Sequence, residues 1–147
     1  MKAILFIAIM ALATVPRGSN LITIESELEG FELFQSVVME LMEQGYTFEN
    51  MDKDFMFLTT APISPRRMNF EYKLDVRVMK NRVQVRSFVR SLESFSARTT
   101  TMRRETENVF ERGANRSLGT SMWRYGWNKS MELAEKIPGE INYFEEE

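Results

Sequence analysis

The chain has 147 residues, of which 44% are hydrophobic and 27% charged, a composition typical of one globular domain and not of a disordered chain. It contains no cysteine and no histidine, which excludes disulfides, thiolate catalysis, cysteine-ligated metals and histidine general bases. The net charge of −2 conceals two halves of opposite sign: residues 21–65 hold nine acids and one lysine, whereas residues 66–104 hold eleven bases and three acids. We therefore expect no catalytic residue, no cofactor and no metal ligand.

Residues 1–19 predict a secretory signal peptide. One lysine precedes an apolar run, and an Ala-Leu-Ala triplet at 11–13 matches a small-x-small cleavage signal. The run is too short for a comfortable membrane span, and no cysteine follows it to carry a lipid. We expect a periplasmic or secreted protein of a bacterial envelope, without a membrane anchor after cleavage. Its mature chain would start between residues 14 and 21, and residues 20–147 would form one domain.

Residues 21–25 alternate as a short first strand, and a helix is expected to follow. The helix starts either at Ser26, with Glu29 completing a capping box, or near Gly30. Gly45 lies where a C-terminal cap belongs. Apolar residues at helical spacing predict the buried face: Leu28, Phe31, Phe34, Val37, Val38, Leu41 and Met42.

A small hairpin is expected next, with strands over residues 46–50 and 55–60 around a polar turn at 51–54. From residue 31 to residue 60 the order is helix, glycine-aromatic pair, strand, Asp-containing turn and strand ending in threonine. This order resembles the repeated domain of small bacterial envelope proteins of the outer-membrane-assembly lipoprotein C type, although the chain lacks their lipobox cysteine. The resemblance covers about a fifth of the chain. It implies a helix-grip-like sheet and a non-enzymatic binding or scaffolding domain, and it names no ligand.

A longer hairpin is predicted by alternation over residues 70–79 and 82–89, joined by Lys80 and Asn81. Asn81 is suited to the positive φ of a two-residue turn. If these two residues form the loop, Met79 pairs with Arg82 and one face becomes apolar on both strands.

The same register places opposite charges against each other on the polar face of this hairpin. Asp75 faces Arg86, and Glu71 faces Arg90. The remaining basic residues are then expected to be unpaired: Lys73, Arg77, Lys80 and Arg82.

Residues 91–116 are polar and predict an excursion from the domain, with a short helix at about 105–112. A second helix is expected over residues 117–137, stopped by Pro138 and Gly139. The tail at 141–147 is a candidate for a short edge segment. Together these elements predict an α+β domain in the order β-α-β-β-β-β-α, with a mainly antiparallel sheet of about five strands and two helices on one face.

Two sets of residues are candidates for a binding surface: the basic residues Lys73, Arg77, Lys80 and Arg82, and the aromatic residues Trp123 and Trp127. For the tryptophans, packing in the core is favoured over an exposed surface. The leading hypothesis is a non-catalytic domain that binds another envelope protein, through the polar face of the long hairpin or the groove beside the last helix. One alternative is an anion-binding module for nucleic acid or acidic polysaccharide. The other is a hydrolase that uses carboxylates alone, namely Glu49, Asp52 and Asp54.

Overall fold

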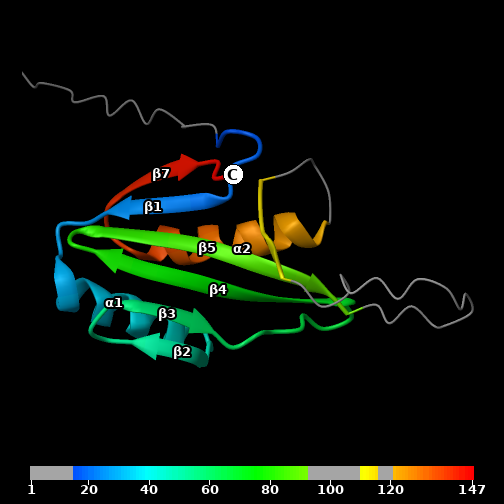
Figure 1. The fold of residues 1–147 in the computed structure, drawn as a ribbon, viewed down its shortest axis with the longest axis horizontal. Coiled ribbons are helices and arrows are strands. Elements are labelled where there is room, and N and C mark those ends of the chain that lie inside the picture. Colours follow the sequence, from blue (N-terminus) through cyan, green and yellow to red (C-terminus); the bar gives the residue numbers. More distant parts are fainter. Residues whose placement is uncertain (1–14, 93–109, 116–120) are drawn as a thin grey trace, which may run out of the picture.

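The computed structural model describes residues 15–92, 110–115 and 121–147, and within them it has an α+β fold. An open antiparallel sheet forms one layer, and both helices lie on the same face of it (Figure 1). The sheet order is β2-β3-β4-β5-β1-β7, and β6 pairs with β5 off this path. The elements are β1 (Leu21–Glu25), α1 (Gly30–Glu43), β2 (Phe48–Asp52), β3 (Phe57–Thr60), β4 (Phe70–Met79), β5 (Arg82–Ser91), β6 (Glu111–Arg112), α2 (Met122–Lys136) and β7 (Glu140–Phe144).

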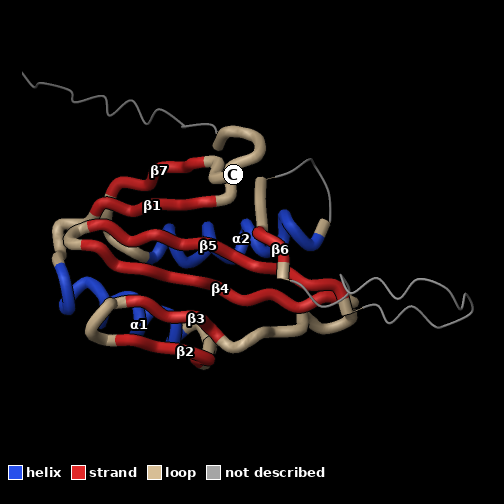
Figure 2. The backbone as a smooth tube through the Cα atoms, viewed as in Figure 1, coloured by secondary structure: helices blue, strands red, loops and turns tan. Residues whose placement is uncertain are grey.

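The predicted fold class is confirmed, and the sheet has seven strands where about five were expected. The tail does form an edge strand, since β7 pairs with β1 from Leu21↔Phe144 to Glu25↔Glu140. The other additional strand, β6, has only two residues and lies beside β5 (Figure 2). A two-residue strand carries no periodicity that a sequence could reveal, because it forms only where tertiary contact supplies its partner.

The long hairpin has the predicted register, with Met79 opposite Arg82 and each outer pair following from it. The positive φ of 54° belongs to Lys80, however, and not to Asn81. Both turn carbonyls accept hydrogen bonds from the β1–α1 connection, at 2.8 Å from Gly30 to Lys80 and 2.8 Å from Ser26 to Asn81. These bonds join the turn to the start of α1.

The core lies between the sheet and the two helices. Along β4 every second side chain from Phe70 to Val78 is buried. On β5 the buried valines are Val83, Val85 and Val89. Helix α2 packs tightly on β5 at Gly126, where an added Cβ would lie only 2.7 Å from a methyl carbon of Val89. The position therefore requires a residue without a side chain.

Helix α1 starts at Gly30, the later of the two predicted starts. The Ser26 hydroxyl accepts a 3.2 Å hydrogen bond from the Leu28 N–H and forms no capping box with Glu29. The predicted buried face is wrong at Phe31 and Met42, which are 56% and 61% exposed. The prediction is confirmed at Phe34, Val37 and Leu41, and Leu33, which was not predicted, is buried beside them.

The small hairpin forms about two residues later in the chain than predicted. Its turn is tightened by Asp52, whose Oδ1 accepts hydrogen bonds from the N–H groups of Asp54 and Phe55 at 2.9 and 3.0 Å. A bulge between Phe48 and Asn50 shifts the register of β2 against β3. These bonds form an Asx-turn at Asp52, and this turn fixes where β2 ends and β3 begins.

Part of the predicted excursion at 91–116 is docked onto the domain. The helix predicted at about 105–112 is wrong at its end, because Glu111 and Arg112 pair with β5 as a strand. Gly113 then donates a 2.8 Å hydrogen bond to the Ser87 carbonyl. Residues 93–109 and 116–120, which include the rest of that helix and the first residues predicted for the second helix, lie outside the described residues.

Residues 15–19, which were predicted to belong to the signal peptide, contact the domain. Gly18 donates to the Asn115 carbonyl at 2.8 Å, and Asn115 donates to the Ser19 carbonyl at 2.8 Å. Ser19 is almost fully buried. Residues 1–14 lie outside the described residues, and neither helix in the described part is long and apolar enough to cross a membrane.

Candidate binding groove

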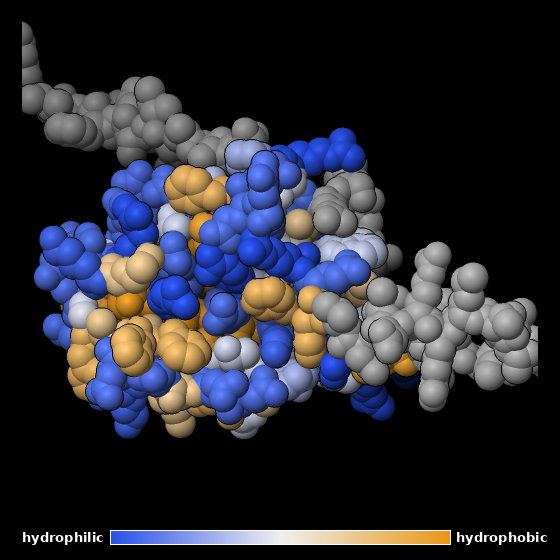
Figure 3. Space-filling view, in the orientation of Figure 1, coloured by the Kyte–Doolittle hydropathy of each residue, from blue (hydrophilic) through white to orange (hydrophobic). Residues whose placement is uncertain are grey.

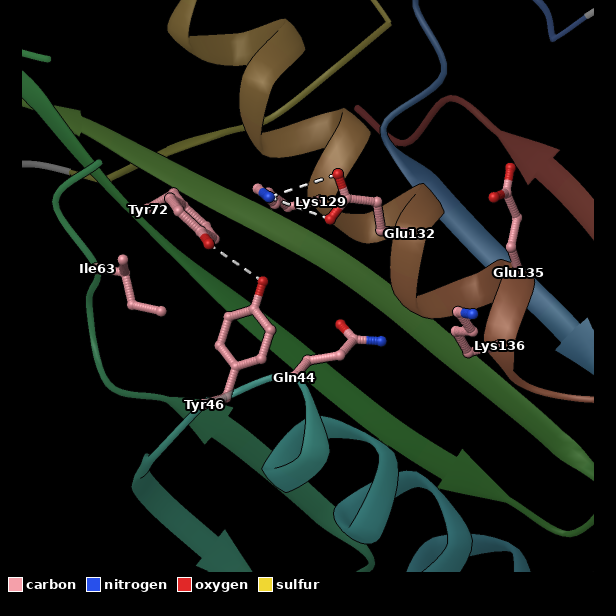
Figure 4. Close-up of a pocket in the computed structure, with 8 residues that line it drawn as sticks. All are labelled: Gln44, Tyr46, Ile63, Tyr72, Lys129, Glu132, Glu135 and Lys136. Atoms are coloured by element: carbon pink, nitrogen blue, oxygen red, sulfur yellow. Dashed lines mark hydrogen bonds and ion pairs between the residues drawn. The ribbon is translucent and has the colours of Figure 1, made fainter. Parts of the chain in front are cut away.

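A groove of about 420 Å³ opens between the end of α1, the start of β4 and the outer side of α2 (Figure 4). Three sequence-distant segments and helix α2 contribute its walls. The lining residues are Gln44, Tyr46, Ile63, Tyr72, Lys129, Glu132, Glu135 and Lys136. Its size is in the lower part of the range of small-ligand sites.

Local backbone geometry places the two tyrosines of the groove. Gly45 has a φ of +88° and ends α1, a conformation that glycine adopts readily. Tyr46 then turns back, with its N–H bonded to the Leu41 carbonyl at 3.0 Å. On the other wall, Ile63 and Tyr72 exchange two backbone hydrogen bonds of 2.8 and 3.0 Å, which holds the segment after β3 against β4.

Tyr46 and Tyr72 meet at their hydroxyl groups, 3.2 Å apart, with rings edge to face at a centroid distance of 6.3 Å. The two residues are only 7% and 4% exposed. Burial raises the pKa of Tyr46 far above its ordinary value, and it raises the pKa of Tyr72 as well. Both groups are therefore neutral phenols at physiological pH, and one bond between them uses only one of their two protons.

Charged residues of α2 form the rim above the tyrosines. Lys129 pairs with Glu132 at 3.1 Å and lies 5.5 Å from the centre of the Tyr125 ring. Burial lowers the pKa of Lys129, but the hydrogen bond to Glu132 and the charge interactions with Glu132 and the nearby tyrosines together outweigh it, so the pKa is raised. Glu135 and Lys136 are exposed and form no ion pair with another described residue. The rim thus carries two positive and two negative groups.

The groove is suited to binding and offers phenol, ammonium, amide and carboxylate groups. Elsewhere in the described ranges, no three acidic side chains come together in a way that could hold a metal ion. A neutral ligand with both donors and acceptors matches the balanced rim, and the apolar ring edges and Ile63 provide contact area.

The basic residues predicted as unpaired are not brought together into one site. Lys73 pairs with Glu49 at 3.3 Å and lies 4.5 Å from the centre of the Phe110 ring. Arg82 pairs with Glu25 at 2.8 Å, so the prediction of free charge is wrong for both. Arg77 and Lys80 are exposed and make no ion pair within the described part of the chain.

The charge pairs predicted across the hairpin are half confirmed. Glu71 and Arg90 form an ion pair. Arg86 lies opposite Asp75 in register, but its guanidinium binds Glu146 with two bonds of 2.7 and 2.8 Å. The acidic tail folds back over this face, where hydrophilic side chains cover the centre and apolar ones gather at the lower left of Figure 3.

The two predicted tryptophans lie outside the groove. Trp127 is 3% exposed and packs against Tyr143 with ring centres 6.0 Å apart, so the preferred interpretation as a core residue agrees with its position. Trp123 is half-buried, and its ring N–H donates a 2.8 Å hydrogen bond to Glu111.

The three carboxylates considered for hydrolysis each have a local structural role or lie in solvent. Glu49 pairs with Lys73, Asp52 caps the β2–β3 turn, and Asp54 is exposed on that turn. None of them lines the groove.

A groove beside the last helix was expected from the sequence, but the residues that line it were not, because they carry no motif. Tyr72 was predicted to be on the apolar face of its strand, and Tyr46 was placed at a strand end. A tyrosine at a core-facing position is nevertheless a usable signal, since its hydroxyl needs a partner when buried. No protein-family model matches this chain, and no curated protein is significantly similar to it.

Proposed function

We propose that this chain is an exported, non-catalytic domain of a bacterial envelope that binds a segment of another envelope protein in the groove beside α2. The observation that carries the proposal is the pair of nearly buried tyrosine hydroxyls, which share one hydrogen bond at 3.2 Å. The hydroxyl that accepts this bond keeps its own proton, which can be donated to an acceptor on a ligand in the groove.

The equal numbers of positive and negative groups on the rim of the groove favour a peptide segment as the ligand over a polyanion. A peptide backbone presents carbonyl acceptors and N–H donors in alternation, which matches a rim of two lysines and two glutamates. An anion-binding module would need a cluster of unpaired cations, whereas two of the four predicted basic residues, Lys73 and Arg82, have carboxylate partners. The absence of histidine and cysteine from the chain supports a non-catalytic role.

Export is supported by the apolar leader at 3–15 and its Ala-Leu-Ala triplet at 11–13. Because residues 15–19 contact the domain, cleavage soon after the triplet suits the fold better than cleavage near residue 19. The resemblance of residues 31–60 to envelope domains of the lipoprotein C type also supports a binding or scaffolding role. Gln44 and Tyr46 of the groove belong to that stretch.

The proposal is tested by affinity capture from an envelope extract, comparing the mature chain with a variant whose groove is filled. Gln44→Trp places a large side chain in the groove from an exposed position at the end of α1. We expect it to reduce capture of the partner by about tenfold or more, because most of the contact area is then blocked.

Asp54→Trp is the matched control, since it adds the same side chain to an exposed turn outside the groove. Capture by this variant should equal that of the unmodified chain. Equal capture by the Gln44→Trp variant would contradict the proposed site, and binding that falls steeply with added salt would favour an anionic ligand instead.

A further inference from the structure

Helix α1 has a second apolar stripe that faces away from the core. Phe31, Gln35, Met39 and Met42 follow one another at i, i+4, i+8 and i+11, which places them in one row along the helix. Three of them are large apolar side chains, and they are 56%, 57% and 61% exposed for Phe31, Met39 and Met42 respectively. A row of exposed large apolar residues on one helix is unusual for a solvent-facing surface.

A polar row runs beside it at the same spacing. It consists of Glu32, Ser36, Glu40 and Glu43. A shallow hollow of about 470 Å³ follows the two rows, with Leu28 and Met39 among its apolar walls and Glu32 and Glu43 among its acidic ones.

The charge of this surface is not compensated within the described residues. Helix α1 contains no lysine and no arginine. Its glutamates form no ion pair with another described residue, and the Glu40 side chain accepts a 2.9 Å hydrogen bond from the Gln44 side chain. The surface is therefore both apolar and acidic.

We propose that the outer face of α1 is a docking surface for a basic amphipathic helix of a partner protein. Such a helix would lay its apolar side chains on Phe31, Met39 and Met42 while its lysines or arginines meet Glu32 and Glu43. Methionine suits this role because its flexible side chain adapts to the shape of an incoming helix. We choose a basic helix as the partner because its charge complements the glutamates of α1. This proposal does not depend on the tyrosine groove.

A second copy of this chain fits the surface less well. Two α1 faces brought together would oppose surfaces of the same negative sign, which costs free energy. A basic helix meets the same carboxylates with opposite charge.

The test uses two synthetic helical peptides of about 18 residues that share one leucine pattern, one with lysine and one with glutamate at all polar positions. Fluorescence anisotropy with the full chain should give at least tenfold tighter binding for the lysine peptide. Met39→Ser should weaken that binding about fivefold or more, and Glu32→Gln with Glu43→Gln should flatten its dependence on salt.

Met79→Ser is the matched control, because Met79 is also exposed, at 42%, but lies at the β4–β5 turn. It should leave peptide binding unchanged, as should Tyr72→Phe, which alters the groove without touching α1, so failure of this proposal is distinguishable from failure of the tyrosine groove. Equal binding of both peptides would overturn the proposal. So would equal effects of Met39→Ser and Met79→Ser, or dimerisation in sedimentation that Met39→Ser abolishes.

Discussion

Gly126 illustrates how one residue in the middle of α2 controls the packing of the helix on the sheet. An added Cβ would lie 2.7 Å from a Val89 methyl carbon and 2.9 Å from the Ser87 hydroxyl oxygen. Alanine normally favours a helix over glycine by about 1 kcal/mol. Here overpacking should dominate, so Gly126→Ala is expected to lower the free energy of unfolding by about 1–2 kcal/mol.

Urea unfolding followed by tryptophan fluorescence measures this change. Asn128→Ala, at an exposed position of the same helix, provides the comparison and should be neutral or slightly stabilising. If both substitutions stabilise the chain alike, the close approach at Gly126 is wrong.

The pairing of Arg86 with Glu146 shows which side-chain contacts the sequence could not predict. Arg86 was expected to pair with Asp75, and the register does bring them opposite each other. The guanidinium instead donates two hydrogen bonds to Glu146, from Nε and Nη2, because a carboxylate from the folded-back tail can approach it side-on. Side-chain partners distant by 60 residues are decided by tertiary folding and leave no local pattern.

At the scale of elements, residues 15–20 act as part of the domain although they precede its first strand. Asn20 and Glu146 clasp each other through two hydrogen bonds, of 2.8 and 2.7 Å. The Asn20 N–H also donates to the Phe144 carbonyl at 2.8 Å. Two backbone hydrogen bonds also join this segment to Asn115, so it contacts both the C-terminal tail and the segment before α2.

We therefore expect a chain that starts at Thr14 to be more stable than one that starts at Leu21, by roughly 2–5 kcal/mol at about 0.5–1 kcal/mol for each of these five hydrogen bonds. Thermal unfolding of the two chains compares them directly. Equal midpoints would mean that these contacts do not contribute to stability, and cleavage anywhere up to residue 20 would then suit the fold equally.

The elements were predicted with uneven success because periodicity is informative only where a segment is long enough to repeat it. The β4–β5 hairpin was predicted with its register because ten-residue strands repeat the alternation many times. Helix α1 was found with most of its buried face, but Phe31 and Met42 were wrongly assigned to that face, since apolar residues continue around the helix and only packing decides which of them are buried. The β6 strand was missed because two residues cannot show a period.

At the scale of the whole molecule, Glu146 of the acidic tail contacts Asn20, just before β1. It also forms ion pairs with Arg86 and Arg112 of the sheet. The hydrogen bond from Arg86 lowers the pKa of Glu146, with a further contribution from Arg112. A carboxyl group with a lowered pKa in the folded state stabilises the fold above its unfolded pKa. This contribution is lost as the pH falls through the folded value.

Glu146→Gln should therefore cost stability at about pH 7, and the difference from the unmodified chain should shrink towards about pH 3. Urea unfolding at several pH values measures both. Glu147→Gln removes a carboxylate from an exposed neighbouring position and should show little such dependence. A difference for Glu146→Gln that stays constant with pH would contradict the ionic role of the tail.

The sequence by itself determined the α+β class, both helices, the long hairpin with its register and the lack of histidine and cysteine chemistry. These follow from composition and from periodicity within a single segment. Only the tertiary structure decided the tyrosine groove, the pairing of Lys73 and Arg82, the outward stripe of α1 and the clasp between Asn20 and Glu146. Each of these depends on residues far apart in the chain meeting at short range, and neither spacing nor propensity within one segment encodes such meetings.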